Sequence, residues 1–192
     1  MNYEAKNFDR LLGLAGFSDQ ALKTHFALYQ GYVANANTLS EKLRQTVPGT
    51  PEYAELRRRF GWEFNGMRLH EYYFGSLSQN PTPLTASLLR TKIEQDFGSF
   101  AAWEKDFRAT AALRGIGWAI LYYDQMADRL SNVWIEQHHA GHLAGCVPLL
   151  PLDVFEHAFL IDYGTKRADY IEAFFKAVDW KVVTERFART QA

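Results

Sequence analysis

The sequence has very little cysteine and no long apolar run. Cys146 is the single cysteine among 192 residues, so the chain cannot form an internal disulfide. No apolar stretch reaches the roughly 18 residues that a membrane-spanning helix needs, and residues 1–6 do not resemble the apolar segment of a signal peptide. We therefore expect a soluble protein of a reducing cytoplasm with no membrane partner. Cys146 is expected to be a small buried hydrophobe rather than a reactive thiol.

An excess of one charge is also missing. The 21 basic and 22 acidic residues nearly cancel, for a formal net charge of −1. A nucleic-acid or anionic-membrane partner held by bulk charge is therefore not expected. What the chain does have is apolar and aromatic residues, 47% and 15% of the sequence, which are enough for a sizeable core.

Prolines are few, and two of them mark the clearest break in the chain. Residues 78–83 read Ser-Gln-Asn-Pro-Thr-Pro, a composition that ends a helix and begins a linker. No internal repeat or low-complexity segment is visible. We expect an N-terminal domain over residues 1–80 and a C-terminal domain over residues 84–192.

The first domain has a helical pattern. Apolar residues recur at spacings of three and four over residues 18–45, and again over residues 51–77. Thr50 and Pro51 form a typical helix start, a capping residue followed by proline in the first turn. Two long helices with a short connection predict an antiparallel hairpin whose apolar faces pack together.

The second domain mixes helices and strands. Helices are predicted over residues 84–96 and 100–113, and a last helix over residues 167–187. Strand-like runs occupy residues 118–123, 130–136 and 149–152, with a hairpin turn at residues 125–128. The expected fold class is α+β, an N-terminal antiparallel helical hairpin followed by an α/β domain with a small three-stranded antiparallel sheet.

Two histidines stand on the apolar faces of the predicted hairpin. A single buried histidine, such as His25 or His70 taken alone, is more often a core residue bonded to a backbone carbonyl. Two of them on facing helices favour a shared function instead, because both rings can point into one gap.

A carboxylate and an imidazole follow the last predicted strand. Asp153 and His157 lie between apolar residues 149–152 and 158–160, so the pair should be buried, and a buried charge must be paired or bound to metal. Three imidazoles and one carboxylate suit a first-row transition metal. No thiolate is nearby, which excludes an iron–sulfur or zinc–cysteine centre. We expect the metal site between the two domains.

These residues carry a family resemblance. Residues 153–158, Asp-Val-Phe-Glu-His-Ala, resemble the C-terminal signature of iron/manganese superoxide dismutases. The similarity includes His25 with Tyr32 and His70 with Tyr73, and it covers nearly the whole chain after about residue 18. Further matching segments are residues 97–100, 117–118, 162–163, 166–170 and 178–180.

The resemblance implies a metal, a reaction and an oligomer. His25, His70, Asp153 and His157 would bind one iron or manganese ion per chain, and the enzyme would convert superoxide to dioxygen and hydrogen peroxide. The four ligands are the same for both metals, so they do not select one. Glu156 would bond the ligand histidine of a partner subunit, which implies a homodimer, with a tetramer as the alternative.

The resemblance also assigns residues around the metal. Tyr32 is similar to a gateway tyrosine, Trp118 to an aromatic of the pocket wall, and Tyr73 to a tyrosine that supports the ligands. For each of these residues, ordinary core packing is the alternative.

The residue that faces the metal-bound solvent is a further question. Many iron forms place a glutamine where this chain has Gly66. The facing group would then come from the second domain, with His138 preferred over its neighbour Gln137. A slip of one residue on a strand would exchange the two.

Several positions depart from the family pattern. Tyr32 follows His25 by seven residues rather than the usual eight, which predicts a continuous α-helix without the one-residue bulge we infer for the usual enzymes. The histidine of the channel mouth is missing, and Tyr29 or Leu28 occupies its region. The remaining departures are Leu160 in place of a tyrosine, and Arg68 and Phe155 in place of tryptophans.

Three alternatives remain open from the sequence. The rebuilt channel is compatible with a superoxide dismutase-like metal-binding protein of weak or different redox activity. A related alternative is oxidation of organic donors by peroxide at the same metal. A separate metal cluster could form from His138, His139 and His142, although a glycine within this stretch disfavours a helix there.

Overall fold

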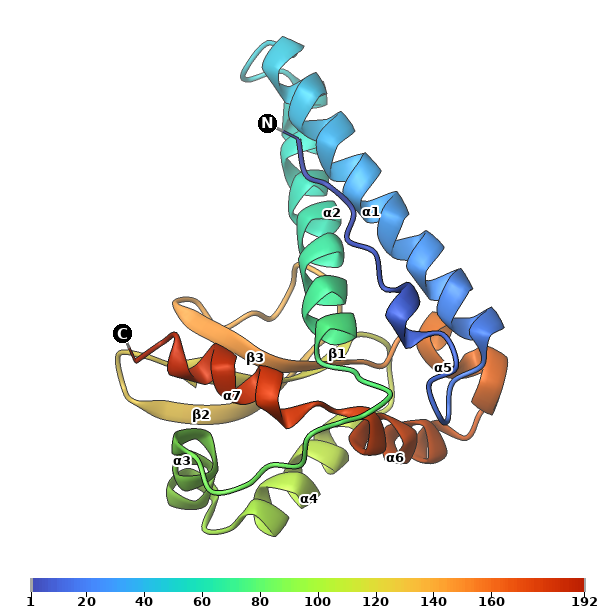
Figure 1. Ribbon diagram of the computed structural model, residues 1–192. Helices are drawn as coiled ribbons and strands as arrows, with labels where there is room; N and C mark the ends of the chain where they lie inside the picture. Colours follow the sequence, from blue (N-terminus) through green and yellow to red (C-terminus); the bar gives the residue numbers. More distant parts are fainter. Residues whose placement is uncertain (1, 192) are drawn as a thin grey trace.

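The computed structural model describes residues 2–191 and has the predicted α+β architecture (Figure 1). A 3-10 turn, η1, precedes two long helices, two shorter helices, three strands and three C-terminal helices. Their bounds are η1 Asp9–Leu11, α1 Asp19–Gln45, α2 Pro51–Gly75, α3 Leu88–Phe97, α4 Phe100–Ala111, β1 Trp118–Asp124, β2 Arg129–Ile135, β3 Cys146–Asp153, α5 Glu156–Tyr163, α6 Arg167–Ala177 and α7 Trp180–Ala188.

Helices α1 and α2 form the predicted antiparallel hairpin, which extends away from the sheet (Figure 1). Both starts are set by capping side chains. Ser18 Oγ accepts a hydrogen bond from the Ala21 amide at 3.0 Å, and Thr50 Oγ1 accepts one from the Tyr53 amide at 3.2 Å. The lower end of the hairpin meets the sheet, and this junction is where the histidines of the two helices lie.

The three strands form an antiparallel sheet in the order β2-β1-β3. The third strand is longer than the predicted residues 149–152 and includes Pro148 and Pro151. Because β3 is an edge strand, a proline without an amide hydrogen is tolerated there. The pairing of β1 with β3 shifts register between Leu121 and Tyr122, which is a β-bulge.

The C-terminal helices differ from the prediction. The single helix expected over residues 167–187 is two helices, α6 and α7, because Val178 is extended and bridges to Leu77 of the hairpin segment. Asp179 then caps α7. Helix α5 was not predicted at all. Helix α3 begins at Leu88 rather than at residue 84, since Ser87 provides its cap.

One continuous apolar core joins the hairpin to the sheet and the C-terminal helices. Cys146 is half-buried against this core rather than fully enclosed, a partial departure from the expectation. Among residues 2–191, every helix is too short or too polar to cross a membrane.

Candidate metal centre

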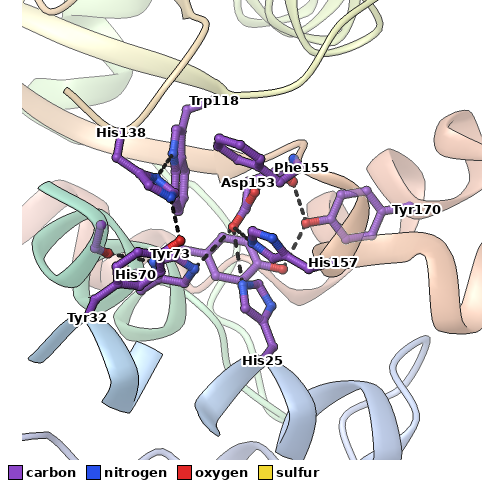
Figure 2. Close-up of polar contacts among 11 residues, drawn as sticks. His25, Tyr32, His70, Tyr73, Trp118, His138, Asp153, Phe155, His157 and Tyr170 are labelled. Atoms are coloured by element: carbon purple, nitrogen blue, oxygen red, sulfur yellow. Dashed lines mark hydrogen bonds and ion pairs between the residues drawn. The ribbon is translucent and has the colours of Figure 1, made fainter. Parts of the chain in front are cut away.

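Four side chains from four elements converge where the hairpin meets the sheet (Figure 2). His25 comes from α1, His70 from α2, Asp153 from the end of β3 and His157 from α5. One ligand atom of each lies within 4.8 Å of the others. The Oδ2 atom of Asp153 is 3.2 Å from His25 Nε2, 3.4 Å from His70 Nε2 and 3.0 Å from His157 Nε2.

The group is largely shielded from solvent, with one exception. His25, His70 and Asp153 are buried, whereas the side chain of His157 is 25% exposed. Burial lowers the pKa of His25 to about 3, although its hydrogen bond to Asp153 opposes the shift. His25 is therefore neutral near pH 7, and a metal ion at Nε2 would replace the hydrogen by which this nitrogen bonds Asp153.

Asp153 is held by hydrogen bonds to neighbouring segments as well as to the ligand rings. Its Oδ1 accepts from the Phe155 amide at 2.9 Å, and its backbone carbonyl accepts from the Tyr170 hydroxyl at 2.7 Å. Burial favours the neutral acid, but the charge and hydrogen bond of His157, followed by the hydrogen bond of His25, hold the pKa of Asp153 well below its usual value. Asp153 therefore presents one negative oxygen, Oδ2, to the three rings.

His70 shows that this cluster fits a cation. Its Nδ1 lies 2.5 Å from the carbonyl oxygen of Gly66, and because a carbonyl can only accept, Nδ1 carries the ring hydrogen. Nε2 then presents a lone pair toward the negative Oδ2 of Asp153. Within residues 2–191 it is the one buried side-chain nitrogen or oxygen without a hydrogen-bond partner. A metal ion between them removes this conflict, and nitrogen and carboxylate ligands without thiolate suit iron or manganese.

His138 lies above this cluster with both ring nitrogens engaged (Figure 2). Trp118 Nε1 donates to His138 Nδ1 at 3.0 Å, and His138 Nε2 lies 2.7 Å from the hydroxyl oxygen of Tyr32. An indole can only donate, so the single hydrogen of the neutral ring is on Nε2, which donates to Tyr32. Burial lowers the pKa of His138 to about 3, consistent with a neutral ring. Gln137, by contrast, is exposed.

Gly66 explains how Tyr32 fits beside the ligands. A methyl group added at Gly66 would lie 2.7 Å from Cδ1 and 2.9 Å from Cγ of Tyr32, closer than real side chains approach. The Tyr32 ring therefore occupies the space that a side chain at position 66 would need, and it stacks on His70 with ring centres 5.3 Å apart. Helix α1 is continuous from His25 to Tyr32, without a π-helical segment, as the seven-residue spacing predicts.

Tyr73 reaches the metal cluster through another tyrosine. Its hydroxyl is 2.9 Å from that of Tyr170, which in turn donates to the Asp153 carbonyl. Tyr73 is therefore the donor to Tyr170, and it supports the ligand strand rather than touching the imidazole nitrogens. Tyr170 was not predicted as a site residue. Its only signal was its place in the matching segment of residues 166–170.

Two other aromatic side chains complete the walls of the centre. Phe155 stacks against His138 and His157, with ring centres 4.7 and 5.2 Å away. Trp62, which was not predicted as a site residue, packs edge-on against His138 with ring centres 4.8 Å apart. A half-buried tryptophan in a helix carries no pattern that distinguishes it from ordinary packing.

Other expected positions contribute no ligand atom to the cluster. Glu156 is exposed on α5, within this single chain. Tyr29 is buried, and its hydroxyl donates to Glu71 at 3.1 Å, so it does not line an entrance. His138, His139 and His142 are not among the metal-type ligand groups of residues 2–191, and their stretch forms bends rather than a helix. The separate metal cluster considered from the sequence is therefore wrong.

Comparison with known proteins gives consistent matches. Residues 85–186 match the family model described as iron/manganese superoxide dismutases, C-terminal domain. The chain is 37% identical to superoxide dismutase [Fe] of Aquifex pyrophilus, over 97% of this chain and 91% of that protein. It is 38% identical to superoxide dismutase [Fe] of Aquifex aeolicus, over 92% and 86%. It is 35% identical to superoxide dismutase [Mn] of Haloarcula marismortui, over 90% and 86%.

Proposed function

Because this chain belongs to the iron/manganese superoxide dismutase family and is a superoxide dismutase using iron or manganese, we propose that His25, His70, Asp153 and His157 bind its single metal ion. The observation that carries this assignment is the unpartnered Nε2 of His70, which faces Asp153 Oδ2 at 3.4 Å. We place the ion between an N-terminal domain, residues 1–80, and a C-terminal domain, residues 84–192. The match of the C-terminal family model to residues 85–186 supports that boundary.

The reaction combines two superoxide ions with two protons to give dioxygen and hydrogen peroxide. The bound ion supplies the one-electron redox chemistry. The protein supplies a proton donor beside it, the hydroxyl of Tyr32. Because His138 Nε2–H donates to the Tyr32 oxygen, the hydroxyl hydrogen is free to bond a substrate oxygen. Burial raises the pKa of Tyr32, which keeps this group protonated.

Trp118 and Tyr73 have orienting roles in this proposal. Trp118 fixes the tautomer of His138 by donating to Nδ1, and Tyr73 supports the Asp153 backbone through Tyr170. Such partners set the orientation and basicity of groups around a metal.

The first test is metal content and dismutation measured on the same sample. We expect about one iron or manganese per chain together with superoxide dismutation, and the elemental analysis names the metal. Metal without dismutation would favour the alternative of a superoxide dismutase-like metal-binding protein. Peroxide-dependent oxidation of an organic donor would then distinguish a different redox activity from none. A reconstituted protein that binds no metal would contradict the ligand assignment.

We further infer a homodimer in which α5 lies at the interface. Leu160 and Ile161 are 49% and 45% exposed on this helix, next to the exposed Glu156 and the partly exposed His157. Arg167 ties the adjoining loop to α6 by donating to the carbonyls of residues 113 and 115, and that loop exposes further apolar side chains, Leu113 and Ile116. A second copy would cover this surface and allow Glu156 of each chain to bond His157 of the other.

The variant Leu160→Glu is expected to convert the dimer to a monomer, because it would bury a carboxylate in an apolar interface. Size-exclusion chromatography with light scattering measures the change at micromolar concentration. Leu88→Glu is the control, since Leu88 is 67% exposed at the start of α3. A monomeric parent protein, or an unchanged dimer in Leu160→Glu, would contradict this interface. A parent mass of four chains would indicate a tetramer.

We also propose that the enzyme works as an antioxidant in the cytoplasm. The single free cysteine and the nearly neutral net charge support a reducing compartment without a nucleic-acid or membrane partner. Cell fractionation tests the location. Recovery in a membrane or extracellular fraction would contradict it.

A further inference from the structure

A second hydrogen-bond chain links the backbone of His138 to β1. His142 Nε2 is 2.8 Å from the backbone carbonyl oxygen of His138, and His142 Nδ1 is 2.5 Å from the hydroxyl of Tyr122. A carbonyl can only accept, so Nε2 carries the hydrogen of the neutral ring. Nδ1 is then an acceptor and the buried Tyr122 hydroxyl is the donor. Both ring nitrogens of His142 are therefore hydrogen-bonded, Nδ1 as the acceptor from Tyr122 and Nε2 as the donor to His138.

The strand β1 supports this chain at two points. Trp118 and Tyr122 are four residues apart, so both side chains project from the same face of β1. Their partners, His138 and His142, are also four residues apart, in a segment that has bends but no helix or strand over residues 136–145. The strand is buried over nearly its whole length and is paired on both sides. A rigid strand thus anchors an irregular segment.

We propose that Tyr122 and His142 are positioning residues for the proton-donating side of the site. Building on the roles proposed above for His138 and Tyr32, they hold the His138 backbone so that its ring keeps Nδ1 on Trp118 and Nε2 on Tyr32. No helix or strand over residues 136–145 holds this backbone in place. Without the bond from His142, the backbone carbonyl of His138 can rotate, and the His138 ring then moves away from Tyr32. The Tyr32 oxygen loses the hydrogen bond that it accepts from His138 Nε2. Its hydroxyl hydrogen is then no longer directed toward the substrate.

The chain offers a matched set of variants. His142→Leu removes both bonds. His142→Gln retains them, because its amide nitrogen can donate to the carbonyl while its oxygen accepts from Tyr122. Tyr122→Phe removes the outer bond alone. Tyr123→Phe is the control, since the Tyr123 hydroxyl is also buried on β1 and bonded, to Asp128 at 2.8 Å, but points away from the site.

The first readout does not depend on activity. In the metal-free protein, the indole N–H resonance of Trp118, assigned with Trp118→Phe, reports its bond to His138. We expect the resonance to move upfield in His142→Leu, to move less in Tyr122→Phe, and to stay in place in His142→Gln and Tyr123→Phe. An unmoved resonance in His142→Leu, or an equal shift in Tyr123→Phe, would overturn the proposal.

The second readout is turnover of the metal-loaded protein. His142→Leu is expected to keep its metal but to lose about 10-fold in kcat. This is the lower end of the loss of activity that is typical when a residue supporting a metal site is removed. His142→Gln should restore turnover. A His142→Gln protein as slow as His142→Leu would overturn the positioning role. If the parent protein does not dismutate superoxide while the indole resonance responds as expected, the proposed function fails and the positioning survives.

Discussion

Replacement of Asp153 by asparagine is expected to empty the site of metal and to lower dismutation by more than about 100-fold. This loss of activity is larger than the one typical of removing a residue that only supports a metal ligand. The reason lies in the fixed orientation of the side chain. Oδ1 accepts from the Phe155 amide, so the oxygen of the new amide must stay there and its nitrogen must take the place of Oδ2. That nitrogen would donate hydrogens toward the imidazole lone pairs, where His70 Nε2 has no other partner.

The measurement is elemental analysis and dismutation activity of purified Asp153→Asn after reconstitution with iron and with manganese. The fold should survive, because the substitution preserves shape and gives Nε2 of His70 a hydrogen-bond donor. Asp128→Asn is the control, since Asp128 also accepts a side-chain hydrogen bond, from Tyr123, but lies at the far hairpin turn. A full complement of tightly bound metal in Asp153→Asn would refute the ligand assignment.

Removal of the metal is expected to cost the parent protein several kcal/mol of unfolding free energy. Metal at about 1,000 times its dissociation constant contributes ~4.1 kcal/mol. For a chain of this size, at ~2–4 °C per kcal/mol, the melting temperature should fall by roughly 8–16 °C. The physical reason is that the ion separates the Oδ2 charge of Asp153 from the lone pair of His70, and the apo-protein must bear that contact.

Calorimetry with and without a chelator measures this loss, and Asp153→Asn gives it an internal control. In that variant the amide satisfies the same lone pair and no metal binds, so the chelator should leave the melting temperature unchanged. An unchanged melting temperature in the parent protein, with complete metal removal verified by elemental analysis, would show that the four side chains are satisfied without an ion.

Sequence patterns predicted the hairpin well because its information is local. The Thr50–Pro51 helix start and the three-and-four spacing of apolar residues reproduced α1 and α2 to within a few residues. The C-terminal helices were predicted less well. The break between α6 and α7 depends on the bridge from Val178 to Leu77, about a hundred residues earlier, and no local pattern encodes that contact.

By itself, the sequence determined the fold class, the family and the chemistry of the candidate ligands, because caps, apolar periodicity and side-chain type are properties of neighbouring residues. Tertiary structure alone decided which side chains face the centre. It turned His138 inward and left Gln137 exposed, and it filled the space beside Gly66 with Tyr32. The direction of a side chain in an irregular segment is set by its partners. Those of His138, Tyr32 and Trp118, lie on a helix and a strand far away in the chain, so only folding brings them together.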